Sequence, residues 1–361
     1  MEATILRLSL SSYNPDNALF CEREKEMEEH VKRGLAVRLA GLALLVATIA
    51  GCTGVRVPKA WEPYLEEVRA FEHRIGFTKT ATFVEFSDEQ GRVPFCGHVS
   101  RLYLPYSYED PAIQWFDVAT ERECRAHANG ADVYFGTVEV LGEAGAAVSP
   151  EVLAVQLHRF LYLVIHEDCH EQFEFPYGIE EALCNLLAYQ GMARFSEEKY
   201  GPGAREYVAI QRYANAETER TRAVKTFYEQ LAGYYALYER NEMSAEALLK
   251  ERARVFGRAE RALAWRRGSI NNVSIANEMT YSRHYPLIEG VYDALGNDLA
   301  RTVAFFKRVD TLKPSPAAVM KKHGIADKDG VDFIRAYEAE IVRTIEAALP
   351  GATRRLAAAG K

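Results

Sequence analysis

The stretch His166-Glu167-Asp168-Cys169-His170 decides how the rest of this chain is interpreted. It follows a run of apolar residues at helical spacing, so we predict that it lies on a helix. Residues four apart share one face of a helix, and the imidazoles of His166 and His170 can therefore reach one metal ion. Glu167 follows the first histidine, where its carboxylate can reach a water bound to that metal. The H-E-x-x-H spacing is typical of zinc-dependent peptide hydrolases.

A third metal ligand is predicted in the segment that follows, residues 176–185 with the sequence PYGIEEALCN. Its proline and glycine should end the first helix and turn the chain into a second, antiparallel helix. Glu181 then lies level with His170 and completes the three protein ligands that a catalytic zinc usually has. Asn185 lies level with His166 and is predicted to orient that imidazole from the second shell by a hydrogen bond.

Glu180 is the alternative to Glu181 as the third ligand. The residue one helical turn after Glu180 is Cys184, a poor hydrogen-bond acceptor, so the spacing favours Glu181. Two glutamates at a helix start would also complement the helix dipole without any metal. The same antiparallel count places Cys169 opposite Cys184. These two thiols could form a disulfide, or they could be two small buried side chains.

The rest of the sequence predicts a small sheet followed by helices, and hence a mostly helical α+β fold. Residues 52–76 would be a tether and a first helix, and residues 77–148 a small α/β lobe. Residues 149–350 would form a helical metal-binding lobe, and residues 351–361 a tail. The predicted strands are residues 80–86, 96–106 and 131–141. The predicted helices are residues 61–75, one helix from 149 through the metal motif, and residues 179–195, 204–237, 245–265, 287–310 and 331–349.

Residues 1–51 are predicted to be an upstream extension and a lipoprotein signal peptide. Basic residues precede a short apolar run that ends in Ile49-Ala50-Gly51-Cys52, and this run is too short to span a bilayer comfortably. The ending resembles the bacterial lipobox, in which the cysteine is lipidated; the alternative is a coincidental cysteine after an ordinary signal or anchor. We therefore expect a lipid anchor at Cys52, a place in the bacterial cell envelope, facing the periplasm or the exterior, and an oxidising compartment. In such a compartment Cys96 could pair with Cys124.

The composition narrows the range of partners. The chain has 361 residues, of which 48% are hydrophobic, so it can bury a sizeable core. Its formal net charge is -7, whereas a nucleic-acid-binding protein normally has a basic excess. We therefore expect no nucleic acid as a partner. The metal motif predicts a peptide or protein substrate, and the lipobox-like ending predicts a membrane attachment.

The metal motif, followed by a short turn and I-E-E-A-L-C-N, resembles the gluzincin metallopeptidases of the thermolysin-like superfamily. Within it the chain is most similar to the predicted aminopeptidases found as bacterial lipoproteins. Asn271-Asn272-Val273, Thr280-Tyr281 and Pro286 fit a similar region of that family. The resemblance covers about a third of the chain. It implies a zincin-like fold, one zinc ion held by His166, His170 and Glu181, and Glu167 as the catalytic base.

The chain departs from that family at several positions. The family usually has leucine in place of Asp168, a small residue in place of Cys169, and asparagine in place of Glu180. The G-x-M-E-N signature of aminopeptidases is absent from the sequence. None of these differences falls on a proposed ligand.

Two functions follow as alternatives. In the first, the protein hydrolyses peptide bonds, Tyr281 donates a hydrogen bond to the developing oxyanion, and the strand at 133–141 is an edge strand that pairs with extended substrate. Tyr281 could instead be one of the 20 tyrosines of the chain, packed in the core. In the second, the protein is a non-catalytic envelope lipoprotein with a structural or degenerate metal site. The charge of Asp168 on the back of the motif helix favours this second function.

Overall fold

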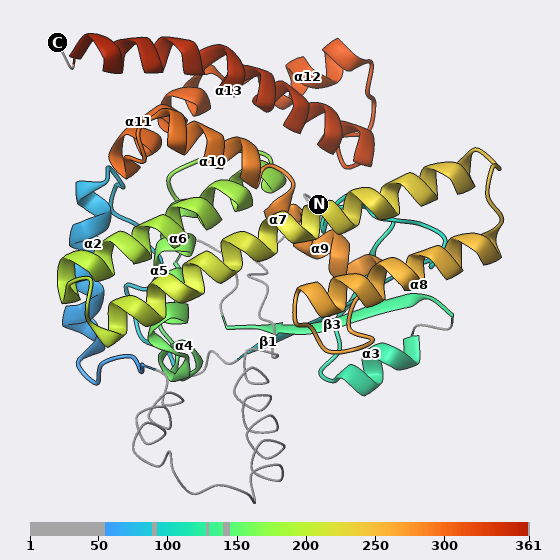
Figure 1. The fold of residues 1–361 in the computed structure, drawn as a ribbon, viewed down its shortest axis with the longest axis horizontal. Coiled ribbons are helices and arrows are strands. Elements are labelled where there is room, and N and C mark those ends of the chain that lie inside the picture. Colours follow the sequence, from blue (N-terminus) through green and yellow to red (C-terminus); the bar gives the residue numbers. More distant parts are fainter. Residues whose placement is uncertain (1–54, 89–91, 128–129, 140–144, 360–361) are drawn as a thin grey trace, which may run out of the picture.

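The computed structural model describes residues 55–88, 92–127, 130–139 and 145–359. In this part the chain is a mostly helical α+β protein, with a small antiparallel sheet near its N-terminal end followed by helices (Figure 1). Cys52 and the signal segment lie outside the described residues, so what the sequence predicts for them stays a prediction. None of the described helices is long and apolar enough to cross a membrane.

The sheet has three antiparallel strands in the order β2-β1-β3. They are β1 (Val93–Val99), β2 (Gln114–Phe116) and β3 (Asp132–Val138), and Cys96 of β1 lies opposite Phe116 and Phe135. A disulfide between Cys96 and Cys124 joins β1 to helix α3 (Glu121–His127). The strand predicted at 80–86 is wrong, because those residues form turns with one isolated bridge from Phe86 to Val148. The short strand β2 was not predicted.

Most predicted helices are present with shifted ends. The helices outside the sheet region are α2 (Trp61–Arg74), α4 (Pro150–Ala154), α5 (Leu157–His170), α6 (Tyr177–Tyr200), α7 (Arg205–Glu239), α8 (Ala245–Ala262), α9 (Asn272–Ser282), α10 (Tyr285–Ala294), α11 (Leu299–Leu312), α12 (Pro316–His323) and α13 (Val331–Ala359). Local signals explain their starts: the Ser149 hydroxyl caps α4 by accepting from the Val152 amide, and Asn271 and Ser274 cap each other's amides at the start of α9.

Three helix predictions need correction. The helix expected to run from 149 into the metal motif is two helices, because Val155 and Gln156 adopt extended backbone conformations between α4 and α5. The helix expected at 287–310 is also two, since Gly296 and Asn297 both have positive φ angles there. The segment at 351–361, expected to be a tail, continues α13 as far as Ala359, with Pro350 inside the helix.

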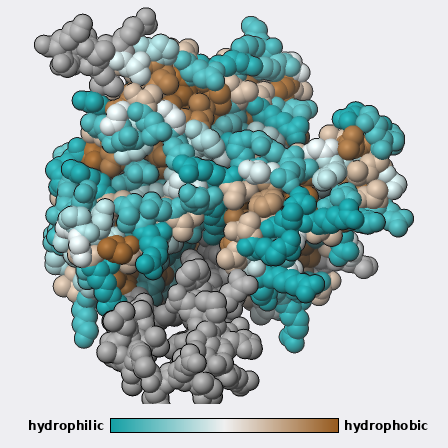
Figure 2. All heavy atoms as spheres, viewed as in Figure 1, coloured by the Kyte–Doolittle hydropathy of each residue, from teal (hydrophilic) through white to brown (hydrophobic). Residues whose placement is uncertain are grey.

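Two hydrophobic clusters organise the helices. The larger one joins α5 and α6 to α2, α10, α11 and α13, and the second lies between α7, α8 and α9. Figure 1 shows α13 lying across one end of the helical part and the sheet lying near α8 and α9. Hydrophilic side chains cover most of the face seen in Figure 2, with apolar side chains in separate patches. Helices α5 and α6 form an antiparallel hairpin inside the larger cluster, and this hairpin carries the metal motif.

Candidate metal centre

The structure brings the three predicted metal ligands together. His166 and His170 lie one turn apart on α5, Glu181 lies on the first turns of α6, and their ligand atoms all fall within 4.8 Å of one another. The two Nε2 atoms are 3.2 Å apart, and the Glu181 carboxylate is 3.1 Å from His166 Nε2 and 3.6 Å from His170 Nε2. Ligands of a tetrahedral zinc at ordinary bond lengths are about 3.3 Å apart. The spacing of this group therefore suits a metal ion of that size.

Burial and charge also suit a cation. His166 and Glu181 are 0% exposed, and neither Glu181 oxygen has a hydrogen-bond partner of ordinary geometry among the described residues. Burial favours a neutral Glu181, but the neighbouring His170 and His166 outweigh it and hold the pKa of this carboxyl below its usual value. Burial likewise favours a neutral His170, yet Glu181 and Glu180 raise its pKa to about 9. The group therefore attracts positive charge at its centre, which a proton or a metal ion can supply.

Glu180 lies behind His170. Its Oε1 atom is 2.9 Å from His170 Nδ1, and its Oε2 atom accepts a hydrogen bond of 2.8 Å from the Phe175 amide. The second contact fixes the carboxylate to the turn between α5 and α6. Histidines that bind a metal through one nitrogen commonly donate the other N–H to a carboxylate, which sets the tautomer. The two neighbouring glutamates thus take different positions, Glu181 in the metal group and Glu180 behind one of its histidines.

The prediction that Asn185 orients His166 directly is wrong. Asn185 Oδ1 instead accepts a hydrogen bond of 2.6 Å from the Tyr162 hydroxyl. The Tyr162 ring stacks on the His166 ring with centroids 4.9 Å apart, while His166 Nδ1 has no partner among the described residues. Asn185 therefore acts on His166 through the tyrosine ring between them. A sequence count gives the height of a residue along a hairpin, and it does not show which side chain fills the space between two helices.

The two predicted catalytic residues lie next to the metal group. Glu167 is buried, and its charge acts on His170, whose pKa it helps to raise. Tyr281 of α9 is also buried, with its ring centroid 6.5 Å from that of His166. Burial and then the charge of Glu181 raise the pKa of the Tyr281 hydroxyl. This hydroxyl therefore stays protonated and can donate a hydrogen bond.

The back of the motif helix is buried against α2. The structure has the disulfide between Cys169 and Cys184, which joins α5 to α6. Asp168 is completely buried, with Arg69 Nε 4.0 Å away. Burial raises the pKa of Asp168 to about 6, although Glu72 and Thr80 beside it act to lower it. Burial and the neighbouring Asp168 also raise the pKa of Glu72. The charge that favoured a non-catalytic function thus belongs to a pair of acids remote from the ligand face.

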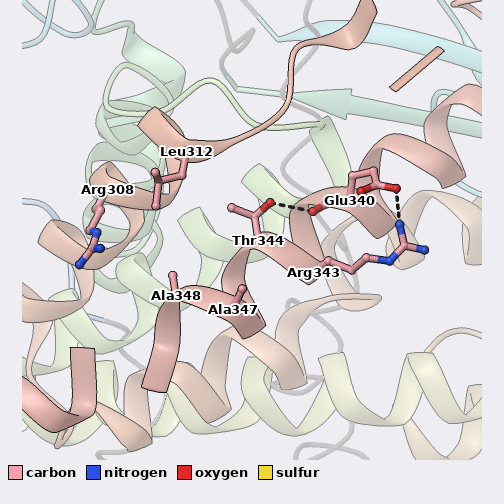
Figure 3. Close-up of a pocket in the computed structure, with 7 residues that line it drawn as sticks. All are labelled: Arg308, Leu312, Glu340, Arg343, Thr344, Ala347 and Ala348. Atoms are coloured by element: carbon pink, nitrogen blue, oxygen red, sulfur yellow. Dashed lines mark hydrogen bonds and ion pairs between the residues drawn. The ribbon is translucent and has the colours of Figure 1, made fainter. Parts of the chain in front are cut away.

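A surface pocket lies elsewhere, between α11 and α13 (Figure 3). It has a volume of about 350 Å³ and is lined by Arg308, Leu312, Glu340, Arg343, Thr344, Ala347 and Ala348. The Glu340 carboxylate is already paired with Lys322, His323 and Arg343. None of the lining residues belongs to the metal group. This pocket is therefore separate from the metal group.

Comparisons with known proteins give no further guide to the site. No family model matches the sequence, and no curated protein and no solved structure matches it either.

Sequence reasoning missed two residues near the metal group. Tyr177, the first residue of α6, lies close enough to Glu181 to contribute to the low pKa of its carboxyl. Asn277 lies one turn before Tyr281 on α9 and is completely buried. Tyr177 falls inside the stretch already quoted for the third ligand, so its neighbourhood could have been inferred. No signal pointed to Asn277, because α9 itself was not predicted.

Proposed function

We propose that this protein is a zinc-dependent peptidase with a zincin-like arrangement of the gluzincin type. One observation carries the proposal: three buried ligand atoms of His166, His170 and Glu181 converge at spacings that suit zinc. Two observations support it. The Glu181 carboxylate is completely buried and lies 3.1 Å from His166 Nε2, and Glu180 holds the second nitrogen of His170. A buried carboxylate beside two imidazoles, one of which is held by a second carboxylate, is a donor set that suits a divalent cation.

In this proposal, each residue in or beside the metal group has one role in catalysis. His166, His170 and Glu181 would hold the zinc, which when bound acts as a Lewis acid and makes its water a nucleophile near neutral pH. Glu167 would accept a proton from the attacking water and return it to the leaving nitrogen. Tyr281, with its raised hydroxyl pKa, would donate a hydrogen bond to the oxyanion. Glu180 would keep His170 in the tautomer whose Nε2 atom is free to bind.

The sheet and the cysteines support a peptide substrate and an exported protein. β3 lies at the edge of the sheet, where extended chains can add as a further strand. The two disulfides fit an oxidising compartment. Together with the lipobox-like ending at Cys52, the disulfides support our proposal of a protein in the bacterial cell envelope, with a lipid anchor and a peptide or protein as the substrate. Because the net charge of the chain is negative, we do not propose nucleic acid as a partner.

The test separates an enzyme from a metal-binding protein. The purified protein should contain one zinc ion per chain and cleave a mixed peptide library. Glu167→Gln should retain zinc and lose turnover by about two to four orders of magnitude, because a general base contributes that much. Zinc retained without turnover in the wild type would favour the non-catalytic lipoprotein. Failure to bind zinc at all, or full activity of Glu167→Gln, would overturn the proposal.

A further inference from the structure

Asn277 has a buried side chain that the fold leaves unpaired. It is 0% exposed, and neither its amide nitrogen nor its amide oxygen has a hydrogen-bond partner among the described residues. Asn272, on the same helix and equally buried, has a full set: its oxygen accepts from Arg252, and its nitrogen donates to the Tyr103 carbonyl and the Tyr235 hydroxyl. Burying an amide without partners is unfavourable. The contrast suggests that the partner of Asn277 comes from outside the described residues.

The place of Asn277 on α9 links the metal group to the sheet. Val273, Asn277 and Tyr281 are four residues apart, so they follow one face of the helix. Tyr281 lies beside His166. At the other end, Val273 belongs to a small apolar cluster against which Trp115 and Tyr134 pack. The unpaired amide therefore lies between the metal group and these half-buried rings.

A row of aromatic rings runs along the same path. Tyr177 lies beside Glu181, its ring centroid is 6.2 Å from that of Tyr108, and the Tyr108 ring is 4.3 Å from Trp115. The Tyr108 amide donates to the Thr280 hydroxyl at 2.9 Å, which ties this row to α9 next to Asn277. Tyr177 and Trp115 are partly exposed. The row thus leads from the buried metal group to the surface.

One glycine of the sheet makes room for this row. A Cβ atom on Gly97 of β1 would lie 2.6 Å from the ring of Trp115, closer than van der Waals contact allows. Because glycine has no side chain, the indole can lie across the strand. At this position β1 has no side chain, and the indole ring of Trp115 occupies the space.

We infer that Asn277 and the rings of Tyr177, Tyr108 and Trp115 form the substrate-binding surface of this site. The inference rests on the proposed peptidase function. An amide carries both a donor and an acceptor, which matches a peptide group of the substrate backbone. The rings offer apolar faces, so they select a peptide with an aromatic or large apolar side chain beside the cleaved bond. The substrate class is therefore an apolar peptide, held through its backbone at Asn277.

Peptide binding to a zinc-loaded but inactive protein tests this inference. The protein carries Glu167→Gln to stop turnover and Trp61→Phe with Trp265→Phe, so that Trp115 is the remaining tryptophan. The probes are two acetylated, amidated tetrapeptides that differ in one central residue, phenylalanine or aspartate. Calorimetry should show the phenylalanine peptide binding at least about tenfold more tightly, because burying an aromatic side chain is favourable and burying a carboxylate is unfavourable. Its binding should also change the emission of Trp115.

Two further variants locate the binding. Asn277→Leu keeps the shape of the side chain and should weaken both peptides about tenfold through the loss of two hydrogen bonds. Its thermal midpoint should stay unchanged or rise, because an unpaired amide is removed. Trp115→Leu should abolish the preference for phenylalanine.

Three results would overturn the inference. They are no binding of either peptide, equal affinity for both, and a lowered thermal midpoint of Asn277→Leu, which would show that its amide has a structural partner. The peptidase proposal fails separately. If the wild type binds both peptides as expected but shows no turnover, the peptidase proposal is refuted and the substrate-binding surface is retained. If the wild type hydrolyses peptides but Asn277→Leu binds them with unchanged affinity, the peptidase proposal is retained and the substrate-binding surface is refuted.

Discussion

The two ends of α9 differ in whether their buried polar side chains are hydrogen-bonded within the protein. At its N-terminal end, Asn272 is fully hydrogen-bonded, and its partner Arg252 also pairs with Asp132 of β3. Toward its C-terminal end the helix faces the metal group, and there Asn277 is buried without a hydrogen-bond partner among the described residues. Both regions are equally removed from water. They differ in whether the chain itself supplies the partners.

The presence or absence of hydrogen-bond partners separates buried polar groups with a structural role from groups that we propose bind a ligand. A buried polar group without a partner costs about 1–3 kcal/mol, and a charged one more. A chain that pairs one buried asparagine so fully has no stability reason to leave another unpaired on the same helix. We conclude that the N-terminal half of α9 holds the sheet to α7 and α8, and we propose that the other half takes part in binding a metal ion and a substrate.

The largest effect is expected for Glu181→Gln. Zinc affinity should fall at least about a thousandfold, because one of three ligands is lost from a site whose binding free energy is of the order of 10 kcal/mol. Peptide hydrolysis should disappear with the metal. Metal content after dialysis and turnover with added zinc measure the two effects. Retention of stoichiometric zinc by Glu181→Gln would show that this carboxylate is not a ligand.

A smaller but clear effect on stability is expected for Asn272→Leu. The change leaves the Arg252 guanidinium and the Tyr103 carbonyl without their partner, so the free energy of unfolding should fall by about 3–5 kcal/mol. Asn277→Leu is the matched control, with the same residue types, helix and burial, and should leave the free energy of unfolding unchanged or raise it. Urea denaturation of both variants gives the comparison. Similar losses in the two variants would remove the distinction between the two ends of α9.

An intermediate effect on metal binding is expected for Glu180→Gln. The carboxylate leaves His170 Nδ1, but the ligand atoms stay, so zinc affinity should fall about tenfold to a hundredfold. Competition with a chelator of known affinity measures this. Glu174→Gln, on the same turn but exposed, serves as the control and should leave zinc affinity unchanged. A loss as large as that of Glu181→Gln would mean that Glu180 is itself a ligand.

The sequence predicted those parts of the fold that depend on local signals. Apolar spacing identified α2, α6, α7 and α8, and the period-two runs identified β1 and β3. It failed where the outcome depends on packing. Residues 80–86 have β-branched and aromatic side chains, yet they find no strand to pair with. Helix α9 is buried on all sides, so its sequence has no polar face to reveal a helical period.

In the candidate site, too, local spacing was predictable from the sequence and packing was not. Helical spacing and one antiparallel turn were enough to bring His166, His170 and Glu181 together. The same count misplaced Asn185, because the ring of Tyr162 lies between it and His166. Asn277 comes from a distant helix, and only the packing of α9 against α6 and the sheet brings it near. Contacts between neighbours in sequence were therefore predictable, and contacts across the core were not.

The smallest effect concerns Asp168 and depends on pH. Neither of its oxygens has a hydrogen-bond partner of ordinary geometry among the described residues, and burial raises its pKa from 3.8 to about 6. A carboxyl whose pKa is raised by folding favours the folded state below its unfolded pKa and loses that contribution as pH rises through the folded pKa. The ionised form therefore destabilises the fold above pH 6. Asp168→Asn should raise the free energy of unfolding by about 1–3 kcal/mol at pH 7.5 and by little at pH 4.

Asp110→Asn is the control, because this equally buried aspartate accepts hydrogen bonds from the Tyr103 hydroxyl and from the amides of Tyr106 and Ala112. Its amide variant has one acceptor oxygen fewer and should be less stable than the wild type at pH 7.5. Denaturation of the metal-free proteins at both pH values keeps zinc release out of the comparison. If Asp168→Asn were as destabilising as Asp110→Asn, then Asp168 would have partners in the fold. In that case a buried group without a hydrogen-bond partner in the structure could still have one in the protein, and Asn277 would no longer indicate a missing ligand.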